Sequence, residues 1–322
     1  MAMRKLEIVH RTHYDYAEPV KLGDYRLMFR PRDSHDLRLL ATNLAIEPAA
    51  QVRWIYDPFG NSIAIASFAE DAVKSLRFVS TIQLEHYGAP PDVPTIEDYA
   101  RKLPFAYLAE EAPDLARYLE RHYPDPNAQV STWARQFIEG EGGDETFTAL
   151  SRMCKGIQET LKYAMRFESG TQPPATTLET GGGTCRDYAL LMMEGARSLG
   201  LAARFITGYL YDSARDTAVD PQASTAYPHA WMEAYLPGAG WMEFDPTNGI
   251  VGSDCLIRIA VARDPEQAMP IKGTFVGAAG VGINALVDVQ VRTQTPLPQE
   301  EGTSTGDAPA VSPAPALETA AH

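Results

Sequence analysis

The first 88 residues alternate short apolar runs with polar positions and show no helical period. Residues 6–10 and 77–84 mix apolar and polar side chains in the manner of half-buried strands. The segments 52–56 and 62–66 flank residues 57–61, whose proline and glycine suit a tight turn and predict a β-hairpin. Several short strands of this kind predict a small antiparallel β-sandwich.

The hydrophobic pattern changes to a helical one after the prolines at positions 90, 91 and 94. Between Glu145 and Phe167, apolar residues recur every three or four positions, which predicts an amphipathic helix. The residues that set this spacing are Leu150, Met153, Ile157, Leu161 and Ala164. Cys154 adjoins the apolar stripe, so we expect it to be a buried and unreactive thiol.

A second helix is predicted from about Cys185 to about Leu199, where apolar residues again recur at helical spacing. Thr184 is a good N-cap residue, and Asp187 stands three positions later, where a capping box places its acid. Gly200 is placed to end the helix in the left-handed conformation. The pattern therefore predicts both ends of this helix.

These segments divide the 322-residue chain into three parts. We predict a β-rich N-terminal domain over residues 1–90 and an α+β core with a helical lead-in over residues 96–292. Residues 293–322 are dominated by proline, alanine, serine and threonine and contain no aromatic residue, which predicts a disordered tail.

The chain is acidic, with a formal net charge of −14 and a sequence pI of about 4.9. An acidic surface repels phosphate backbones and anionic membrane faces, so we expect neither a nucleic acid nor a membrane as partner. The charge names no partner by itself, since a solubilising surface has the same composition.

The N-terminal sequence does not resemble a signal peptide, because His10, Arg11 and His13 interrupt any apolar run. No segment approaches the roughly 20 apolar residues of a membrane span. The expected location is therefore cytoplasmic.

The three cysteines, Cys154, Cys185 and Cys255, are too few and too scattered for a disulfide framework. The sequence has no CxxC pair of the kind that binds zinc, and no acidic EF-hand loop that would bind calcium. We therefore expect no metal and no cofactor.

Cys185 is the first candidate for chemistry, because it would lie in the first turn of the predicted helix. Free backbone N–H groups and the positive end of the helix dipole favour a thiolate there and could hold an oxyanion. A small buried cysteine is the competing interpretation. A phosphate-binding loop is disfavoured, because Cys185-Arg186 follows the glycines where such a loop needs Lys-Ser/Thr.

A thiolate nucleophile usually requires a histidine that a third group holds in place. His229 begins a predicted strand, 228–236, and Asp245 ends the next one, 241–245. Alone, a strand histidine is usually structural and an aspartate before proline is an ordinary turn residue. Zinc bound by Cys185 and His229 would lack further ligands. The joint order of cysteine, histidine and aspartate favours a triad.

The hairpin must place both partners of the cysteine on one face. A four-residue loop would pair Leu236 with Trp241 and send His229 and Asp245 to opposite faces. We therefore predict an odd loop or a bulge that brings Thr247 opposite His229. Asp245 then becomes a diagonal neighbour of the histidine, at about 7–8 Å between Cα atoms.

Two stretches around these residues resemble the bacterial transglutaminase-like cysteine peptidase family: GGGTCRDYALLMMEGARSLGLAARFITGYL and HAWMEAYLPGAGWMEFDPTNG. Two earlier stretches, YDYAEPVKLGDYRLMFRPRD and DPFGNSIAIASF, are similar to the β-rich N-terminal domain that accompanies this core in bacteria. The resemblance implies a papain/transglutaminase-like cysteine-proteinase core, in which a helix bearing the cysteine packs on an antiparallel sheet. It assigns the catalytic roles to Cys185, His229 and Asp245.

The resemblance implies thioester chemistry on an amide bond of a peptide or protein substrate. Hydrolysis is the favoured outcome; acyl transfer to an amine and a catalytically silent binding module are the alternatives. Tyr163 and Gln158, expected on the preceding helix, are candidates for a second oxyanion donor beside the Cys185 backbone N–H, and either could equally be structural. Arg186 is a candidate partner for a carboxylate. Residues 212–226 could form a flap over the site or a plain surface loop. The oligomeric state is left open.

Overall fold

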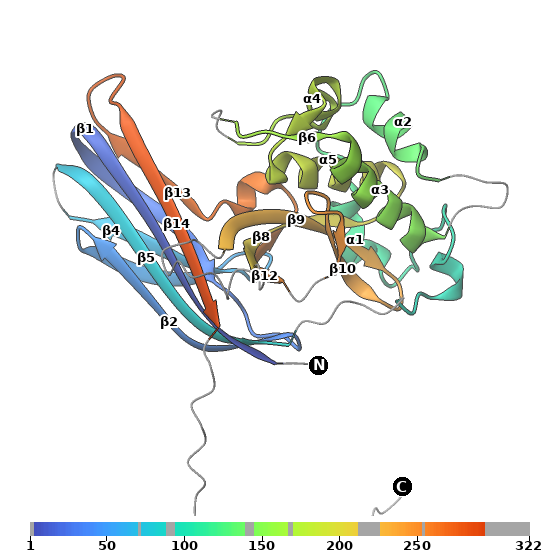
Figure 1. The fold of residues 1–322 in the computed structure, drawn as a ribbon, viewed down its shortest axis with the longest axis horizontal. Coiled ribbons are helices and arrows are strands. Elements are labelled where there is room, and N and C mark those ends of the chain that lie inside the picture. Colours follow the sequence, from blue (N-terminus) through green and yellow to red (C-terminus); the bar gives the residue numbers. More distant parts are fainter. Residues whose placement is uncertain are drawn as a thin grey trace, which may run out of the picture.

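The computed structural model describes residues 3–69, 72–87, 94–138, 145–166, 170–211, 226–252 and 255–293, with residues 226 and 227 described by their backbone alone. Apart from Thr293, the predicted tail 293–322 lies outside the described residues. The fold is α+β, as expected, with an N-terminal antiparallel sheet on one side and a smaller sheet covered by helices on the other (Figure 1).

The first sheet is organised around one very long strand. Its strands are β1 (Arg4–Arg30), β2 (Leu37–Glu47), β3 (Ala50–Tyr56), β4 (Ser62–Phe68) and β5 (Val73–His86), in the order β2-β5-β1-β4-β3. The first half of β1 pairs with β5, and the end of its second half, from Tyr25 to Arg30, pairs with β4. β1 therefore passes from one layer to the other, and the sheet folds over a shared apolar core that includes Tyr25, Leu27 and Phe78.

The hairpin predicted around residues 57–61 is confirmed. Tyr56 pairs with Ser62 at the start of the turn, and Asp57 closes it by accepting hydrogen bonds from the backbone N–H groups of Phe59 and Asn61. Gly60 has a positive φ of 76°, which a glycine adopts at little cost. The turn residues read from the sequence thus set the β3–β4 pairing.

Two further strands of this sheet come from the far end of the chain. β13 (Ile271–Val276) pairs with the second half of β1, and β14 (Ile283–Thr293) pairs with the first half, from Leu6 to Tyr16. Residues 271–293 fall in the range that the sequence assigned to the α+β core. A local sequence pattern does not indicate that the hydrogen-bonding partner of these strands lies at the N-terminus.

The second sheet has the order β11-β10-β9-β8-β12. Its strands are β8 (Ala203–Tyr211), β9 (Ala226–Leu236), β10 (Gly240–Asp245), β11 (Ile250–Val251) and β12 (Leu256–Ala262). Leu6 and Ile8 of β1 pack together with Tyr209 and Ile257 of this sheet in one buried cluster. The two sheets are therefore joined by an apolar interface.

Helices cover the other face of the second sheet (Figure 1). They are α1 (Ala112–Leu119), α2 (Gln129–Arg135), α3 (Thr146–Thr160), α4 (Pro174–Thr180) and α5 (Cys185–Ser198), with short 3₁₀ turns at Asp98–Ala100 and Pro265–Ala268. Helix α5 is central, since every residue from Asp187 to Arg197 is buried. It packs mainly on β9, and α2, α3 and α4 surround it.

The helix predicted from Glu145 to Phe167 is too long, since α3 ends at Thr160. Leu161 is already extended, and strand β6 (Lys162–Tyr163) pairs in parallel with β7 (Gly182–Gly183). The backbone N–H of Lys162 bonds to Gly181 and that of Ala164 to Gly183. This pairing with a distant segment outweighs the helical spacing of the apolar residues.

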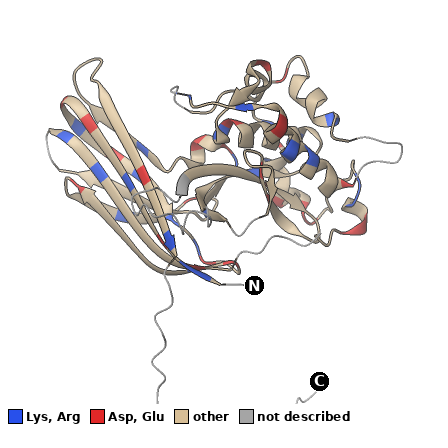
Figure 2. Ribbon diagram, in the orientation of Figure 1, with Lys and Arg blue, Asp and Glu red and all other residues tan. Residues whose placement is uncertain are grey.

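Acidic and basic residues are interspersed on the strands and the helices, so neither sign of charge is confined to one part of the described chain (Figure 2). No helix among the described residues has the length and apolar character needed to cross a membrane.

Candidate active site

Cys185 is the first residue of helix α5, as predicted. Thr184 is the N-cap and Asp187 completes a capping box with it. At the other end Gly200 has a φ of 82°, and the backbone N–H of Leu201 reaches back to the carbonyl of Ala196. This pattern is a Schellman motif, so both predicted ends of the helix are confirmed.

Asp187 fixes the start of this helix from a fully buried position. Its carboxylate accepts the backbone N–H of Thr184 at 2.8 Å, that of Gln172 at 2.8 Å, and the guanidinium of Arg166 at 2.8 and 2.9 Å. Burial alone would raise the pKa of Asp187, but Arg166 and the backbone donors lower it overall. A charged Asp187 therefore holds the turn that presents Cys185.

The β9–β10 hairpin has the register that the triad requires. Gly240 pairs with Leu236 and Trp241 with Tyr235, so Pro237–Ala239 form an odd, three-residue turn. Glycines with positive φ at 238 and 240 make this turn possible. The odd loop is as predicted, whereas Thr247, expected opposite His229, lies in the turn that follows the end of β10 at Asp245. In this register Asp245 is the diagonal neighbour of His229.

His229 and Asp245 are hydrogen-bonded on one face of this hairpin. Nε2 of His229 lies 2.8 Å from Oδ2 of Asp245, and both side chains are buried. The Asp245 carboxylate also accepts the backbone N–H of Thr247 at 3.0 Å and Nδ2 of Asn248 at 2.7 Å. The carboxylate is thus held by three donors and in turn orients the imidazole.

The imidazole of His229 also forms a hydrogen bond with Cys185. Because Asp245 engages Nε2, the nitrogen left for the thiol is Nδ1. Burial would lower the pKa of His229, but the hydrogen bonds to Asp245 and Cys185 raise it to about 10. At neutral pH the ring therefore carries its proton.

Of the two candidates for a second oxyanion donor, Tyr163 lies beside the cysteine. It belongs to strand β6 and not to a helix, and its hydroxyl forms a hydrogen bond with Cys185. Burial, followed by the proximity of Cys185, raises the pKa of Tyr163, so the phenol keeps its proton. Gln158 is exposed on α3 and lies beside Gly249.

Three further expectations concern Arg186, the predicted flap and Cys154. Arg186 is half-buried and makes no ion pair with a carboxylate in the described ranges. The segment 212–225 of the predicted flap lies outside the described residues, and Ala226 begins β9. Cys154 is buried, as expected, and donates to the carbonyl of Ile250; burial raises its pKa, and the charge of Asp245 raises it further.

Two residues near the triad were missed in the sequence. Trp231 is buried and stacks on His229, with ring centroids 6.0 Å apart and planes 24° apart. It stands two residues along the same strand, so strand periodicity could have placed it on the same face. Asn248 belongs to a Pro-Thr-Asn-Gly turn, which reads as an ordinary turn until Asp245 is recognised as part of the site.

A metal centre is not evident in the described part of the chain, where no three His, Cys, Asp or Glu residues cluster to hold one ion. The three cysteines are all free thiols. The chemistry available at this site is therefore that of the thiol, the imidazole and the carboxylate.

The chain is similar to other proteins over most of its length. The uncharacterized protein ML0607 of Mycobacterium leprae is 23% identical over 291 residues, covering 89% of this chain and 99% of the relative. The uncharacterized protein Rv2569c of Mycobacterium tuberculosis is 23% identical over 304 residues, with coverages of 89% and 91%. A crystal structure of a proposed cysteine protease from Cytophaga hutchinsonii is 17% identical, with a TM-score of 0.68 over 96% of this chain and 94% of that chain.

Two family models match this chain, one in each of its two parts. Residues 131–246, which contain Cys185, His229 and Asp245, match the transglutaminase-like superfamily. Residues 6–85 match the bacterial transglutaminase-like N-terminal region. The resemblance seen in the sequence is therefore confirmed: the chain combines a bacterial transglutaminase-like N-terminal region with a transglutaminase-like core.

Proposed function

We propose that the protein is a thiol-dependent hydrolase of peptide or amide bonds, in which Cys185 is the nucleophile, His229 the acid and base, and Asp245 the residue that orients His229. The observation that carries the proposal is the position of His229, hydrogen-bonded to Asp245 on one side and to Cys185 on the other. A nucleophile, a base and an orienting group in this relation define a catalytic triad.

The reaction follows from the protonation state of this pair. The thiolate Sγ of Cys185 attacks the carbonyl carbon of the amide, and the oxygen becomes an oxyanion. In this proposal the backbone N–H of Cys185, at the start of α5, and the hydroxyl of Tyr163, beside Cys185, donate to that oxyanion. His229 gives its proton to the leaving amine, which departs and leaves a thioester on Cys185.

The second half of the reaction regenerates the thiol. His229, now neutral, takes a proton from water, and the hydroxide equivalent adds to the thioester. Collapse of this adduct releases the carboxylic acid and returns the Cys185–His229 pair to its first state. We favour water as the acceptor because transfer to an amine requires a site that excludes water. Transfer to an amine remains the alternative outcome of the same triad.

A catalytically silent binding module is the competing function from another class. Such a module would not need the three hydrogen bonds that hold the Asp245 carboxylate or the protonated imidazole beside the thiol. The substrate that we propose is a peptide or protein, with neither a nucleic acid nor a membrane as partner.

Alkylation of the cysteines separates an enzyme from a silent module. We expect iodoacetamide to modify Cys185 rapidly at pH 6, because the protonated His229 sustains a thiolate there, and His229→Gln to slow this reaction at least tenfold. Cys255→Ala is the matched control, since Cys255 is half-buried and outside the triad. Equal rates for the wild-type and His229→Gln proteins at pH 6 would rule out the triad.

A screen of a peptide library, with and without an added primary amine, then tests the reaction itself. Hydrolysis predicts new carboxyl groups whose yield does not depend on the amine and which Cys185→Ala abolishes. Products that incorporate the amine at the expense of the carboxylate would favour transfer. Absence of both products, together with slow alkylation, would favour the silent module.

A further inference from the structure

The N-terminal sheet has two edge strands that border a common space. In the order β2-β5-β1-β4-β3, strands β2 and β3 stand at the two ends, and each pairs with one neighbour among the described strands. Cavities between the layers are lined by residues from both edges, such as Thr42 of β2 and Trp54 of β3. The two layers therefore stay open toward solvent along this side of the sheet.

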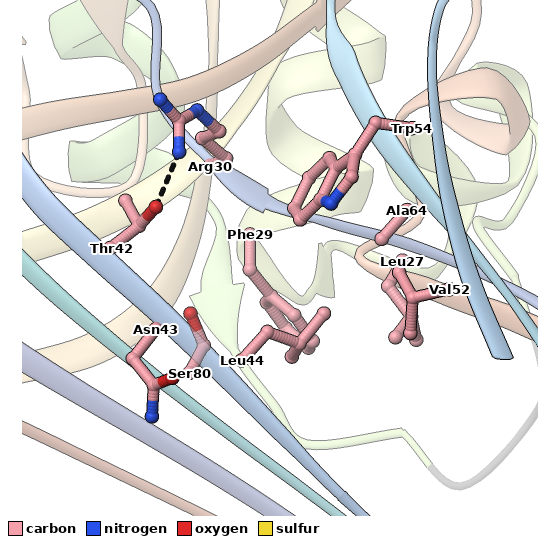
Figure 3. Close-up of a pocket in the computed structure, with 10 residues that line it drawn as sticks. All are labelled: Leu27, Phe29, Arg30, Thr42, Asn43, Leu44, Val52, Trp54, Ala64 and Ser80. Carbon is pink, nitrogen blue, oxygen red and sulfur yellow. Dashed lines mark hydrogen bonds between the residues drawn. The ribbon is translucent and has the colours of Figure 1, made fainter. Parts of the chain in front are cut away.

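Three cavities follow one another along this opening, with volumes of about 310, 290 and 410 Å³. Arg30 lines all three, and we call the resulting channel the edge groove. Thr42 and Asn43 lie on one side of the first cavity and Val52 and Trp54 on the other (Figure 3). Phe29 and Leu44 lie between them (Figure 3).

The edge groove has an apolar floor and an exposed aromatic rim. Leu27 and Phe29 of β1 form part of the floor and are 1% and 4% exposed. On the rim, Trp54 is 49% exposed and Tyr56 is 75% exposed. Large apolar residues on an open edge strand favour pairing with another chain, and natural proteins usually avoid them. Their presence here indicates a surface that is kept for a partner.

The charge of the groove is positive in an otherwise acidic protein. The guanidinium of Arg30 donates to the hydroxyl of Thr42, and that of Arg32 donates to the carbonyl of Phe59. Neither arginine forms an ion pair with a carboxylate within the described ranges. The Asp33 carboxylate, which lines the third cavity, accepts the backbone N–H of Leu39. Two arginines in the groove thus lack an acidic partner, whereas the whole chain carries a net charge of −14.

We propose that the edge groove binds an extended polypeptide segment that carries apolar side chains and at least one carboxylate. The backbone of the segment would add to an open edge of the sheet, as in other cases of strand addition. An apolar side chain would enter the cavity between Phe29 and Trp54, and a carboxylate would pair with Arg30. The segments of β2 and β3 that line the edge groove are five to six residues long, which corresponds to roughly 16–20 Å of extended chain.

This site is separate from the candidate active site. Its lining comes from β1 to β5 of the N-terminal sheet and the turns beside them, whereas the candidate catalytic residues lie on α5, β9 and β10 (Figure 1). The proposal concerns binding and does not depend on the proposed hydrolysis. Cys185→Ser is expected to bind the segment as tightly as the wild-type chain, so failure of one proposal can be told from failure of the other.

Fluorescence anisotropy with a labelled probe tests the groove in the full-length protein. The probe is a fluorescein-labelled peptide of sequence Gly-Glu-Val-Asp-Phe-Glu-Val-Asp-Gly with an amidated end. We expect saturable binding that weakens at least tenfold in Arg30→Glu and at least fivefold in Trp54→Ala. Arg53→Glu is the matched control, because Arg53 is on the same strand, is exposed and lines none of the three cavities; it should retain the affinity within threefold.

Further probes check the charge and the backbone pairing. A probe with lysine in place of each acidic residue should bind at least tenfold more weakly, and so should a probe that is N-methylated at alternate peptide bonds. Near-ultraviolet circular dichroism establishes that each variant is folded, and Arg30→Gln replaces Arg30→Glu if the latter is not.

Three results would overturn the proposal. The first is unchanged affinity in the folded Arg30 variant, and the second is equal binding of the lysine probe. The third is a large gain in affinity for the probe when the chain is ended at residue 293. That gain would mean that the residues after 293 occupy the groove in the full-length chain, so that the groove serves the chain itself and not a separate polypeptide.

Discussion

His229 is the residue on which the candidate site depends most, because two opposing effects act on it. Burial in the protein disfavours the charged ring, whereas the hydrogen bonds to Asp245 and Cys185 favour it and prevail. Three donors from the protein hold the Asp245 carboxylate in place. The charge on the imidazole is therefore a property of the folded state, and it links the site to the stability of the protein.

The stability of the protein should fall in alkaline solution because of this residue. The pKa of His229 rises from 6.5 to about 10 on folding, so its contribution is complete below pH 6.5 and is lost as the pH rises through 10. Urea unfolding at pH 6, 8 and 9.5 should show this loss, with a slope of at most about 1.4 kcal/mol per pH unit. His229→Gln should flatten that part of the profile, and identical profiles would contradict the assignment.

The positions of Cys185, His229 and Asp245 in the fold could be predicted from the sequence, but the residues around them could not. Cys185 follows a good cap, His229 lies near the start of β9 and Asp245 ends β10, so local patterns were sufficient to place them. Trp231 and Asn248 have ordinary local patterns as well. Their positions become informative only when the β9–β10 register brings His229 beside Asp245.

Helix α5 is the element that presents Cys185, and a single buried carboxylate holds its first turn. Asp187 joins three segments, because it accepts donors from Arg166, Gln172 and Thr184. Residues 166 and 172 come from the chain between β6 and α4, so the same carboxylate also fixes the wall of the site beside Tyr163. The Asp187 carboxylate therefore contributes both to the stability of the fold and to the position of Cys185.

Substitution of Asp187 should therefore damage both the fold and the reactivity of Cys185. Asp187→Ala removes the carboxylate that accepts hydrogen bonds from Arg166, Gln172 and Thr184, and removal of one member of a buried pair costs about 3–5 kcal/mol. Asp98→Ala, at an exposed first-turn acid of a short helix, is the control and should cost little. Thermal unfolding and the rate of alkylation at pH 6 measure the two effects. A loss below about 1 kcal/mol would contradict this role.

The borders that depend on local chemistry agree with those predicted from the sequence, whereas the borders that depend on pairing with a distant segment do not. Helix α5 begins and ends where Thr184 and Gly200 predict. Helix α3 stops at Thr160 although apolar spacing continues, because Lys162 and Ala164 bond to residues near Gly182. A periodic pattern records which face of a segment is apolar, and it does not record a hydrogen bond to a strand twenty residues away.

At the scale of the whole molecule, the N-terminal sheet is completed by the last strands that the structure describes. β14 pairs with β1 over the segment from Tyr16 back to Leu6, and β13 pairs with its second half. The predicted boundary near residue 90 remains a proposal for the start of the core. The sheet on its N-terminal side, however, is built from both regions of the chain.

A chain that ends at residue 270 should therefore lose the order of its N-terminal sheet. Without β13 and β14, the whole length of β1 would have an unpaired side, and buried residues such as Val289 and Val291 would be missing from the cluster between the sheets. We expect a shortened, aggregating or proteolysed product. A chain ended at residue 293 is the control and should remain folded. Limited proteolysis and circular dichroism distinguish the two, and a stable chain of 270 residues would refute this expectation.

The return of β13 and β14 to β1 also sets an order of events during synthesis. β1 is translated before β13, and 240 residues separate its end at Arg30 from the start of β13 at Ile271. The segment that carries Cys185, His229 and Asp245 leaves the ribosome before the strands that complete the neighbouring sheet. A nascent chain would thus hold a nucleophile and its partners while one side of β1 is still open. The final closure of the molecule is then made by its most distant residues, after the whole active-site segment has been synthesised.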